Sequence, residues 1–345
     1  MSTLYILGAG CSKNYSQATH QIQGLESPVN TNFFKMARLV IENTGMRLDA
    51  VFMEEIDSLI KKIAPLYGSN SNDLSFFDNP NLNLEEVMTL LDIDFKLFSL
   101  GAKLEQRESR QLRALKELLA RTLDYALKGP QCRKHRTLAR RMQKGDVVLN
   151  FNYDILLDNA LFNLGKVTDS GYMMNFFKVN QDDFWENQIE EPSDVTLFKL
   201  HGSLNWVRCG LCGSLMLYRF RKQAMYGAHV FQCPRCSADE TFGLRMMVPP
   251  IQSKEYHDRD IAFLWVQADR MLKKFSQIVC IGYSFSPSDF DMTSLMRRLR
   301  TRQTKMPEVY FVNPDLKAEN RLKIILGINK VNHFDDLSSY LKSTN

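Results

Sequence analysis

The sequence predicts an α/β fold built on a doubly wound parallel sheet, and two observations support that prediction. Five apolar runs have the length of buried strands, and they lie at residues 2–7, 146–150, 195–200, 277–282 and 308–312. Helical patterns follow three of them, at 154–164, 288–302 and 315–326. Because strands alternate with helices, neighbouring strands are expected to run parallel.

Length and composition restrict the class of protein. The chain has 345 residues, of which 44 are Lys or Arg and 39 are Asp or Glu, so its net charge is +5. A charge this small excludes a histone-like polycation and an acidic disordered tail. The sequence holds no apolar run of membrane-spanning length, and its first residues lack the pattern of a signal peptide. We therefore expect a cytoplasmic protein without a membrane partner.

Helical periodicity marks a large segment between the first two predicted strands. Apolar residues recur at helical spacing over 32–64 and 84–127. Residues 68–83 are rich in Asn, Ser, Asp and Pro, which predicts an exposed loop between helices. We interpret 1–345 as a single domain with a mostly helical insertion over 30–145.

Two C-x2-C pairs predict a structural zinc site. The pairs are 20 residues apart, a spacing typical of zinc modules. Four thiolates on two tight turns can surround Zn²⁺ and leave no open position for water, so the metal would be structural. A redox dithiol and iron–sulfur ligation are the alternatives. The predicted ligands, within a zinc-binding insertion over 205–245, are Cys209, Cys212, Cys233 and Cys236.

The segment Gly8-Ala9-Gly10 follows the first strand, where a Rossmann-like sheet places its phosphate-binding turn. Free N–H groups and a helix start would favour a pyrophosphate there. Lys13 stands where the third glycine of G-x-G-x-x-G is expected, so an ordinary turn is the alternative. Cys11 can face a ligand beside this turn, whereas Cys132 and Cys280 are interpreted as buried small hydrophobes or exposed spare thiols.

Polar side chains follow the other strands, at the carboxyl ends where open α/β sheets bind ligands. Asn152 and Asp154 come after the second strand, and His201 after the third. A helix cap is the alternative role for Asp154, and a structural role the alternative for His201. The polar positions after the last two strands, fit to contact ribose or adenine, are Gly282, Ser284 and Asn313.

Taken in order, these motifs resemble the sirtuin family. The most specific part is His-Gly-Ser running into two C-x2-C pairs, and the resemblance covers most of the chain. The motifs that carry it are Gly8-Ala9-Gly10-x-Ser12, Asn152-x-Asp154, His201-Gly202-Ser203, the four cysteines, Gly282-x-Ser284 and Asn313.

The resemblance implies an NAD⁺ site with catalytic residues Asn152, Asp154 and His201. Cleavage of the nicotinamide–ribose bond builds positive charge on the ribose C1′, which a site must stabilise while it activates a nucleophile. Asn152 would orient the ribose or a water, Asp154 would stabilise the ring, and neutral His201 would accept a proton. The residues implied to bind the remainder of NAD⁺ are Gly8, Ala9, Gly10, Ser12, Gly282, Ser284 and Asn313.

Departures from the family pattern favour hydrolysis over deacylation. The Gly-Ile-Pro-Asp-Phe-Arg stretch of protein-deacylating sirtuins is missing from 13–23, and Phe151 replaces an expected Gln. The segments around Asn152, His201 and Gly282 resemble the bacterial sirtuin-like domains of anti-phage defence. That resemblance implies an NAD⁺ hydrolase that releases nicotinamide and ADP-ribose, and an antiviral effector that depletes NAD⁺.

Two other functions remain open from the sequence. One is an NAD-dependent protein deacylase or ADP-ribosyltransferase, and the other is a non-catalytic nucleotide-binding module. Residues 101–150 hold 13 Lys or Arg and 5 Asp or Glu, so this basic helical face is a nucleic-acid-binding candidate, although such runs are usually solvated. Because uncontrolled NAD⁺ loss would harm the host, an activating protein or a homo-oligomer is the expected partner.

Overall fold

The computed structural model describes residues 2–13, 15, 22–98, 109–179, 192–218, 233–237, 243–248, 259–272, 275–286 and 289–343. The chain divides into two compact units. The sheet unit comprises Met1–Ser12, Gly129–Met247 and Tyr256–Asn345, and the helical unit comprises Lys13–Lys128 and Val248–Glu255. Every site residue predicted from the sequence belongs to the sheet unit. The division into one domain with two insertions stays a prediction.

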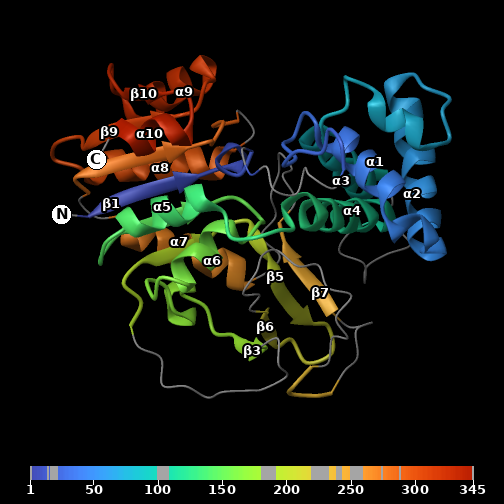
Figure 1. The fold of residues 1–345 in the computed structure, drawn as a ribbon, viewed down its shortest axis with the longest axis horizontal. Coiled ribbons are helices and arrows are strands. Elements are labelled where there is room, and N and C mark those ends of the chain that lie inside the picture. The colour runs from blue at the N-terminus through green and yellow to red at the C-terminus, as the bar shows by residue number, and fades with distance from the viewer. Residues whose placement is uncertain are drawn as a thin grey trace. The chain divides into compact units, whose positions relative to one another are not determined.

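A six-stranded parallel sheet forms the centre of the sheet unit (Figure 1). Its strands are β1 (Thr3–Leu7), β2 (Val147–Asn150), β4 (Thr196–Lys199), β8 (Gln277–Ile281), β9 (Glu308–Val312) and β10 (Asn332–Phe334). They lie in the order β10-β9-β8-β1-β2-β4. β2 is buried at every position, which is typical of a strand covered on both faces. All five strands predicted from apolar runs are confirmed, and β10 was not predicted.

The strand order places a topological switch point between β1 and β8. From β1 the chain steps to β2 and β4, whereas from β8 it steps to β9 and β10 in the opposite direction. Leu7 pairs with Asn150 on one side and with Ile281 on the other, so the carboxyl ends of β1, β2 and β8 are level. Open α/β sheets bind ligands at such a point.

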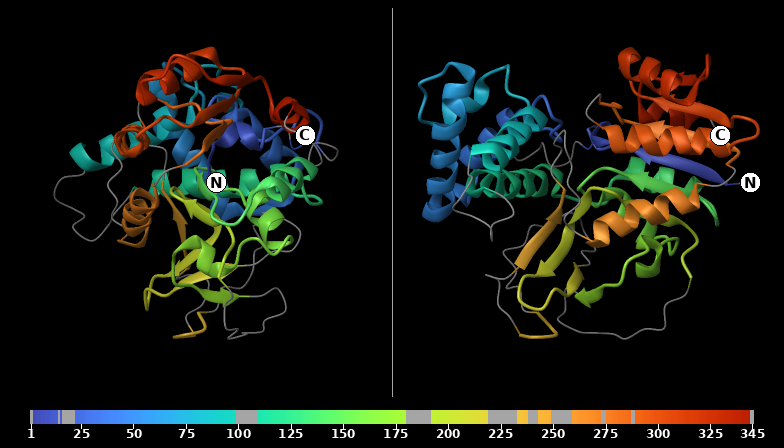
Figure 2. Two further views of the ribbon diagram at one scale, coloured as in Figure 1. Left: turned by 90° about the vertical axis from the view of Figure 1, so that its left-hand side faces the viewer. Right: turned by 180° about the vertical axis from the view of Figure 1, so that it is seen from behind.

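Helices cover both faces of this sheet, as a doubly wound fold requires (Figure 2). They are α5 (Arg133–Arg141), α6 (Leu156–Phe162), α7 (Arg259–Met271), α8 (Phe290–Arg302), α9 (Leu316–Leu326) and α10 (Leu337–Ser343). α5 packs against α6 and α10, and α8 packs against α7 and α9. Right-handed crossovers that step in opposite directions put these two groups on opposite faces. The predicted fold class is therefore confirmed.

A second, smaller sheet lies in the same unit and was not predicted. It contains β3 (Phe177–Val179), β5 (Gly202–Cys209), β6 (Leu215–Tyr218) and β7 (Gly243–Met247), in the order β3-β6-β5-β7 (Figure 1). Trp206 of β5 is fully buried, and its ring meets Tyr172 edge-on with the centroids 5.5 Å apart. β5 begins directly after His201, so this sheet connects that histidine to the cysteine pairs.

The helical unit holds α1 (Phe33–Asn43), α2 (Ala50–Ile63), α3 (Leu84–Phe98) and α4 (Arg110–Leu127). α4 packs against each of the other three, because its apolar face is buried along its whole length. Side-chain caps begin two of them: Asp49 Oδ1 accepts the N–H of Phe52, and Ser109 Oγ accepts that of Leu112. The helices predicted over 32–64 are confirmed, and so are those over 84–127 except at residues 99–108, which lie outside the described residues. Among the described residues, no helix is long and apolar enough to cross a membrane.

The segment 68–83 lies between helices and is largely exposed, as predicted, but its apolar residues enter the core. Phe76 and Phe77 are buried, and the Phe77 ring lies 5.2 Å from that of Phe34 on α1. Short polar residues supply the turns on either side, while the aromatic pair enters the core. The 3-10 turns of the chain include η1 (Ala9–Cys11), η3 (Gly45–Leu48), η4 (Ala64–Tyr67), η5 (Leu74–Asp78) and η6 (Asp169–Tyr172).

Candidate functional site

The glycine turn after β1 lies directly against the turn after β8. The N–H of Gly10 donates to the carbonyl of Gly282 at 3.0 Å. Gly282 has a φ of +63°, and a Cβ there would lie 2.1 Å from the backbone nitrogen of Cys11. A Cβ at Gly8 would meet the Cα of Tyr283 at 2.6 Å. Glycine is therefore required on both sides of this contact, which lies at the switch point.

The glycine turn offers close backbone approach rather than a row of free donors. The N–H groups of Gly8, Gly10, Cys11 and Ser12 all donate to carbonyls within the chain. This differs from the expectation that free N–H groups would hold a pyrophosphate. Ala9 at the tip is exposed, so a ligand can reach the backbone there without meeting a bulky side chain.

Ser12, Asn152 and Asp154 form a buried hydrogen-bonded cluster next to this turn. Ser12 Oγ donates to Asp154 Oδ2 at 2.8 Å, and Asn152 Nδ2 donates to Ser12 Oγ at 3.4 Å. The three residues are 1%, 7% and 5% exposed. Asn150 Oδ1 accepts the N–H of Asn152, and Asp154 Oδ1 accepts that of Leu156. Both carboxylate oxygens of Asp154 are therefore engaged, so Asp154 also anchors the start of α6.

His201 lies between β4 and β5, beside the loop that follows β2. Its ring meets Phe151 edge-on, with centroids 5.1 Å apart, and lies 6.4 Å from the ring of Tyr153. Gly202 has a φ of +80°, and a Cβ there would lie 1.9 Å from the carbonyl oxygen of Met246. The residue after the histidine must therefore be glycine, because β7 passes too close for a side chain.

A buried ion pair holds these two loops together. Lys199 and Asp158 are 0% and 1% exposed at their side chains, and Lys199 Nζ lies 3.3 Å from Asp158 Oδ2. Lys199 Nζ also donates to the backbone carbonyl of Asp154. Tyr172 donates its hydroxyl to the second oxygen of Asp158 at 2.6 Å. The strand that leads to His201 is thereby tied to the loop that carries Asp154.

The turns after β8 and β9 hold the remaining predicted contacts. Asn313 Nδ2 donates to the carbonyl of Tyr283 at 3.2 Å, and its Oδ1 accepts the N–H of Asp315. Asn313 therefore shapes the neighbouring turn. Ser284 is exposed, and Phe285 after it has a φ of +49°, a strained conformation for a bulky residue. Strain of this kind is concentrated at functional sites.

The four predicted zinc ligands form one cluster at the end of β5. Their Sγ atoms all lie within 4.8 Å of one another. Cys209 and Cys236 are 3.7 Å apart at sulfur, and Cys212 and Cys233 are 3.5 Å apart. A zinc–sulfur bond of about 2.3 Å puts tetrahedral sulfurs about 3.8 Å apart, so the donor set fits Zn²⁺. Hydrogen bonding to Ser214 lowers the pKa of the Cys212 thiol to about 6, which favours the metal-binding thiolate.

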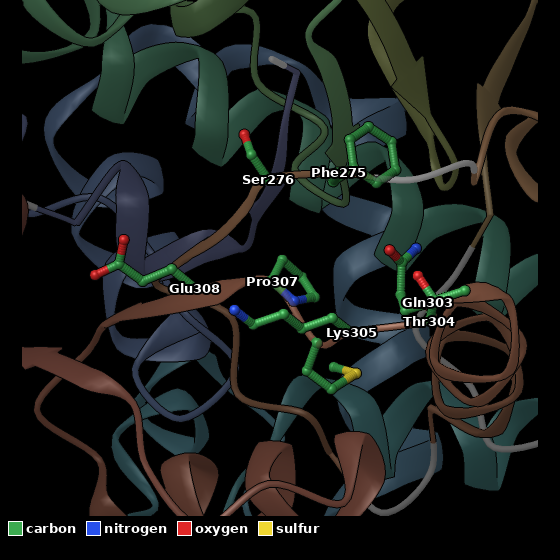
Figure 3. Close-up of a pocket in the computed structure, with 8 residues that line it drawn as sticks. Phe275, Ser276, Gln303, Thr304, Lys305, Pro307 and Glu308 are labelled. Atoms are coloured by element: carbon green, nitrogen blue, oxygen red, sulfur yellow. The ribbon is translucent and has the colours of Figure 1, made fainter.

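A separate pocket of about 600 Å³ opens between Phe275 and Glu308 (Figure 3). It lies where β8 and β9 begin, next to Ser276 and Pro307. Since ligands of open α/β sheets bind at the opposite, carboxyl ends of the strands, this pocket is not part of the candidate site.

The structure thus brings most of the predicted residues into three groups, and leaves Ala9, Ser284 and Asn313 outside them. Ser12, Asn152 and Asp154 share hydrogen bonds, with His201 on the next loop. The glycines at 8, 10 and 282 meet at the switch point, and the cysteines cluster separately. Lys199 was missed, because a lysine that ends an apolar run resembles a surface residue and its partner Asp158 is 41 positions away.

Comparison with known proteins gives weak similarities. No protein-family model matches the sequence, and no curated protein is a significant match. Among solved structures, a mutant Sir2 homologue in complex with ADP-ribose is similar over 68% of this chain and 74% of its own, with 13% identity and a TM-score of 0.39. A structure on the mechanism and regulation of Sir2 enzymes is similar over 63% and 78%, with 14% identity and a TM-score of 0.34. Function must therefore be argued from this chain's own residues.

Proposed function

We propose that the chain binds NAD⁺ at the switch point and hydrolyses its nicotinamide–ribose bond, giving nicotinamide and ADP-ribose. The observation that supports this most is the cluster of Ser12, Asn152 and Asp154 beside His201. These groups come from turns after β1, β2 and β4 and are buried together at the carboxyl edge of the sheet. Buried polar groups that converge at a switch point are expected of a ligand site rather than of a core.

Each side chain has a place in this chemistry. As nicotinamide leaves, positive charge develops on C1′, and Asn152 orients the ribose or the attacking water. His201 accepts the proton of that water. Both carboxylate oxygens of Asp154 already accept hydrogen bonds, one of them from Ser12. Asp154 therefore stabilises the positive charge on C1′ electrostatically rather than by direct contact. The glycine turn lets the pyrophosphate approach the backbone closely at exposed Ala9, next to Ser12, and Gly282, Ser284 and Asn313 shape the adenosine end.

Water is the proposed nucleophile because the deacylase stretch is missing from 13–23 and the expected Gln is replaced by Phe151. Its ring contacts His201 and also lies 4.6 Å from the ring of Tyr283, so it connects the histidine to the turn after β8. An aromatic wall beside the proposed base limits the access of bulk solvent. The zinc cluster lies apart from this chemistry, and we assign it a structural role.

The deciding experiment follows nicotinamide and ADP-ribose by chromatography after incubation of the purified chain with NAD⁺. The variants Asn152→Ala and His201→Ala are expected to lose activity by about 100-fold or more, as removal of a positioned catalytic group does. Asn163→Ala is the matched control, because Asn163 is exposed at the end of α6 and lies outside the cluster.

A parallel incubation with an acetylated peptide separates hydrolysis from deacylation. Nicotinamide release without peptide supports the hydrolase. Release that requires the peptide and yields O-acetyl-ADP-ribose would instead establish a deacylase. Binding of NAD⁺ with neither product would support the non-catalytic module.

We further propose that the activity serves anti-phage defence and is held back until a protein partner or self-assembly releases it. The test is cellular NAD⁺ during phage infection of bacteria that express the chain. A fall in NAD⁺ with wild type and none with Asn152→Ala supports this role. Equal NAD⁺ levels and equal phage yields in the two strains would exclude it.

A further inference from the structure

A chain of three buried side chains lies outside the proposed site and contacts its glycine turn. His135 Nε2 lies 3.4 Å from Cys11 Sγ, and His135 Nδ1 lies 3.1 Å from Cys132 Sγ. His135 is 1% exposed, Cys11 4% and Cys132 7%, and neither cysteine forms a disulfide. One imidazole therefore contacts a thiol at each nitrogen. Cys132 is buried, which agrees with one of the two roles that the sequence suggested, but it also contacts an imidazole.

The surroundings decide which sulfur carries the negative charge. Cys132 is the N-cap of α5, where the helix dipole favours an anion. α5 contains five Lys or Arg residues and no Asp or Glu. Cys11 has no comparable environment, because it ends a single 3-10 turn. A thiolate at Cys132 is thus stabilised by its helix and by the ring of His135.

The acid–base balance agrees with this geometry. Burial alone raises the pKa of the Cys132 thiol, but hydrogen bonding and the charge of His135 outweigh it and leave that pKa below its ordinary value. Burial lowers the pKa of His135, while contact with Cys11 and, to a smaller extent, with Cys132 raises it well above the ordinary value, so the assignment of the charge to Cys132 rests on its place at the start of α5. Both directions favour a thiolate–imidazolium pair.

We propose that Cys132 is a modification site, a thiolate held by imidazolium His135 that reacts with small electrophiles and with peroxides. With an alkyl halide, the sulfur forms a bond to carbon and halide leaves. With hydrogen peroxide, the sulfur attacks one oxygen and the O–O bond breaks. The sulfur is oxidised to sulfenic acid, and the released hydroxide takes the proton of His135 to form water.

Modification acts on the nucleotide turn through His135. Once the Cys132 sulfur is modified, it no longer offers a negative charge to His135 Nδ1. The His135 ring then changes its contact with Cys11. Cys11 belongs to η1, and the backbone nitrogen of Cys11 lies against Gly282. We expect the capped protein to bind NAD⁺ more weakly. This consequence rests on the proposed function, whereas the reactivity of Cys132 does not.

The test labels the folded wild-type chain with iodoacetamide and measures each cysteine by peptide mass spectrometry. Cys280 is the internal reference, because it is fully buried and burial raises the pKa of its thiol. Cys132 is expected to react at least about 10-fold faster than Cys280 and faster than Cys11, since the thiolate is the nucleophile. Equal rates at Cys132 and Cys280 would overturn the proposal.

Two histidine variants test the pairing. His135→Gln is expected to slow labelling of Cys132 by about 10-fold. His333→Gln, which changes a histidine on β10 that contacts Glu319, is the matched control and leaves the rate unchanged. A folded His135→Gln protein, verified by circular dichroism, that labels Cys132 at the wild-type rate contradicts the ion pair. If His135→Gln does not fold, the wild-type rates still decide.

Calorimetry with NAD⁺ before and after labelling separates the two proposals. A chain that labels at Cys132 but never binds NAD⁺ supports the reactive thiol and rejects the proposed function. A chain that binds NAD⁺ but does not label at Cys132 rejects the reactive thiol and leaves the proposed function to the product assay. Cys132→Ser should bind NAD⁺ and become insensitive to iodoacetamide, and persistence of the inhibition in this variant would assign the effect to another cysteine.

Discussion

At the scale of single residues, the absence of a side chain at Gly282 allows two turns of the candidate site to touch. Its φ of +63° and its contact with the backbone of Gly10 and Cys11 both forbid a Cβ. The contact joins β1 to β8 at the switch point, although the two segments are separated by most of the chain. The candidate site therefore depends on a backbone-to-backbone approach.

Replacing Gly282 with Ala should destabilise the fold more than positive φ alone explains. Gly165 has a similar φ of +67° and nothing within 4 Å of a built Cβ, so Gly165→Ala is the matched control. We expect about 1–2 kcal/mol for Gly165→Ala, the cost of a left-handed conformation. Gly282→Ala should cost several kcal/mol by urea unfolding, because backbone has to move as well. Equal costs would show that the close approach is relaxed in solution.

The buried ion pair of Lys199 and Asp158 gives a second prediction at this scale. Lys199→Ala leaves Asp158 buried without its cation, which typically costs about 3–5 kcal/mol. The double variant Lys199→Met with Asp158→Asn should recover part of that loss, since no charge is left unpaired. Chemical unfolding of the three proteins measures the coupling. A single variant that loses less than the double variant would contradict the role of the ion pair.

The sequence predicted individual site residues better than their partners. Ser12, Asn152, Asp154 and His201 follow apolar runs, so their positions at strand ends could be inferred from local pattern. The partnership of Cys132 with His135 was missed because the two look like an isolated cysteine and a residue of a basic helix. Only the fold places Cys11, 124 positions away from His135, at the same imidazole.

At the scale of elements, the central strands were predictable and the second sheet was not. β1, β2, β4 and β8 are apolar runs buried almost throughout, and β9 is an apolar run exposed only at its first residue, so all five are visible without any partner. β3 and β10 are only three residues long, and β5 continues directly from the β4 segment. Their pairing depends on the fold rather than on a local period. In η5 the sequence predicted too much exposure. The polar turn residues around it indicated a loop, although Phe76 and Phe77 are buried.

The cysteine cluster gives a prediction for the second sheet. Cys209 and Cys233 are fully buried and pack with Met216, so the cluster acts as a small core as well as a candidate zinc site. The purified chain should contain one zinc per molecule by elemental analysis. A chelator or Cys236→Ser should remove it and lower the melting temperature of the sheet unit. Full zinc content in Cys236→Ser would show that the fourth ligand lies elsewhere.

At the scale of the whole molecule, the balance of carboxylate pKa values predicts acid sensitivity. The backbone N–H of Phe52 lowers the pKa of Asp49, and that of Ser339 lowers the pKa of Asp336. Burial raises the pKa of Glu319, but hydrogen bonds from Lys323 and His333 leave it lowered. Groups with lowered pKa values stabilise the fold above their unfolded pKa and lose that effect as pH falls.

Stability should therefore decrease as the pH falls below about 5. Asp146 opposes the trend, because burial raises its pKa and protonation relieves an unfavourable charge. The lowered groups are more numerous and occur in both units, so their loss should dominate. Melting temperatures measured between neutral and acidic pH test this. A melting temperature that rises on acidification would assign the larger effect to Asp146.

The discontinuous sheet unit also determines the order in which the chain can fold as it is synthesised. β1 emerges early, but its partner β8 begins roughly 270 residues later. At usual translation speeds this separation lasts on the order of 10 to 60 seconds. The helical unit, whose contacts lie mainly within Lys13–Lys128, can form during that interval. On the ribosome, β1 has no partner until β2 emerges roughly 140 residues later, and its other neighbour β8 follows later still, which makes this apolar strand a natural target for chaperones.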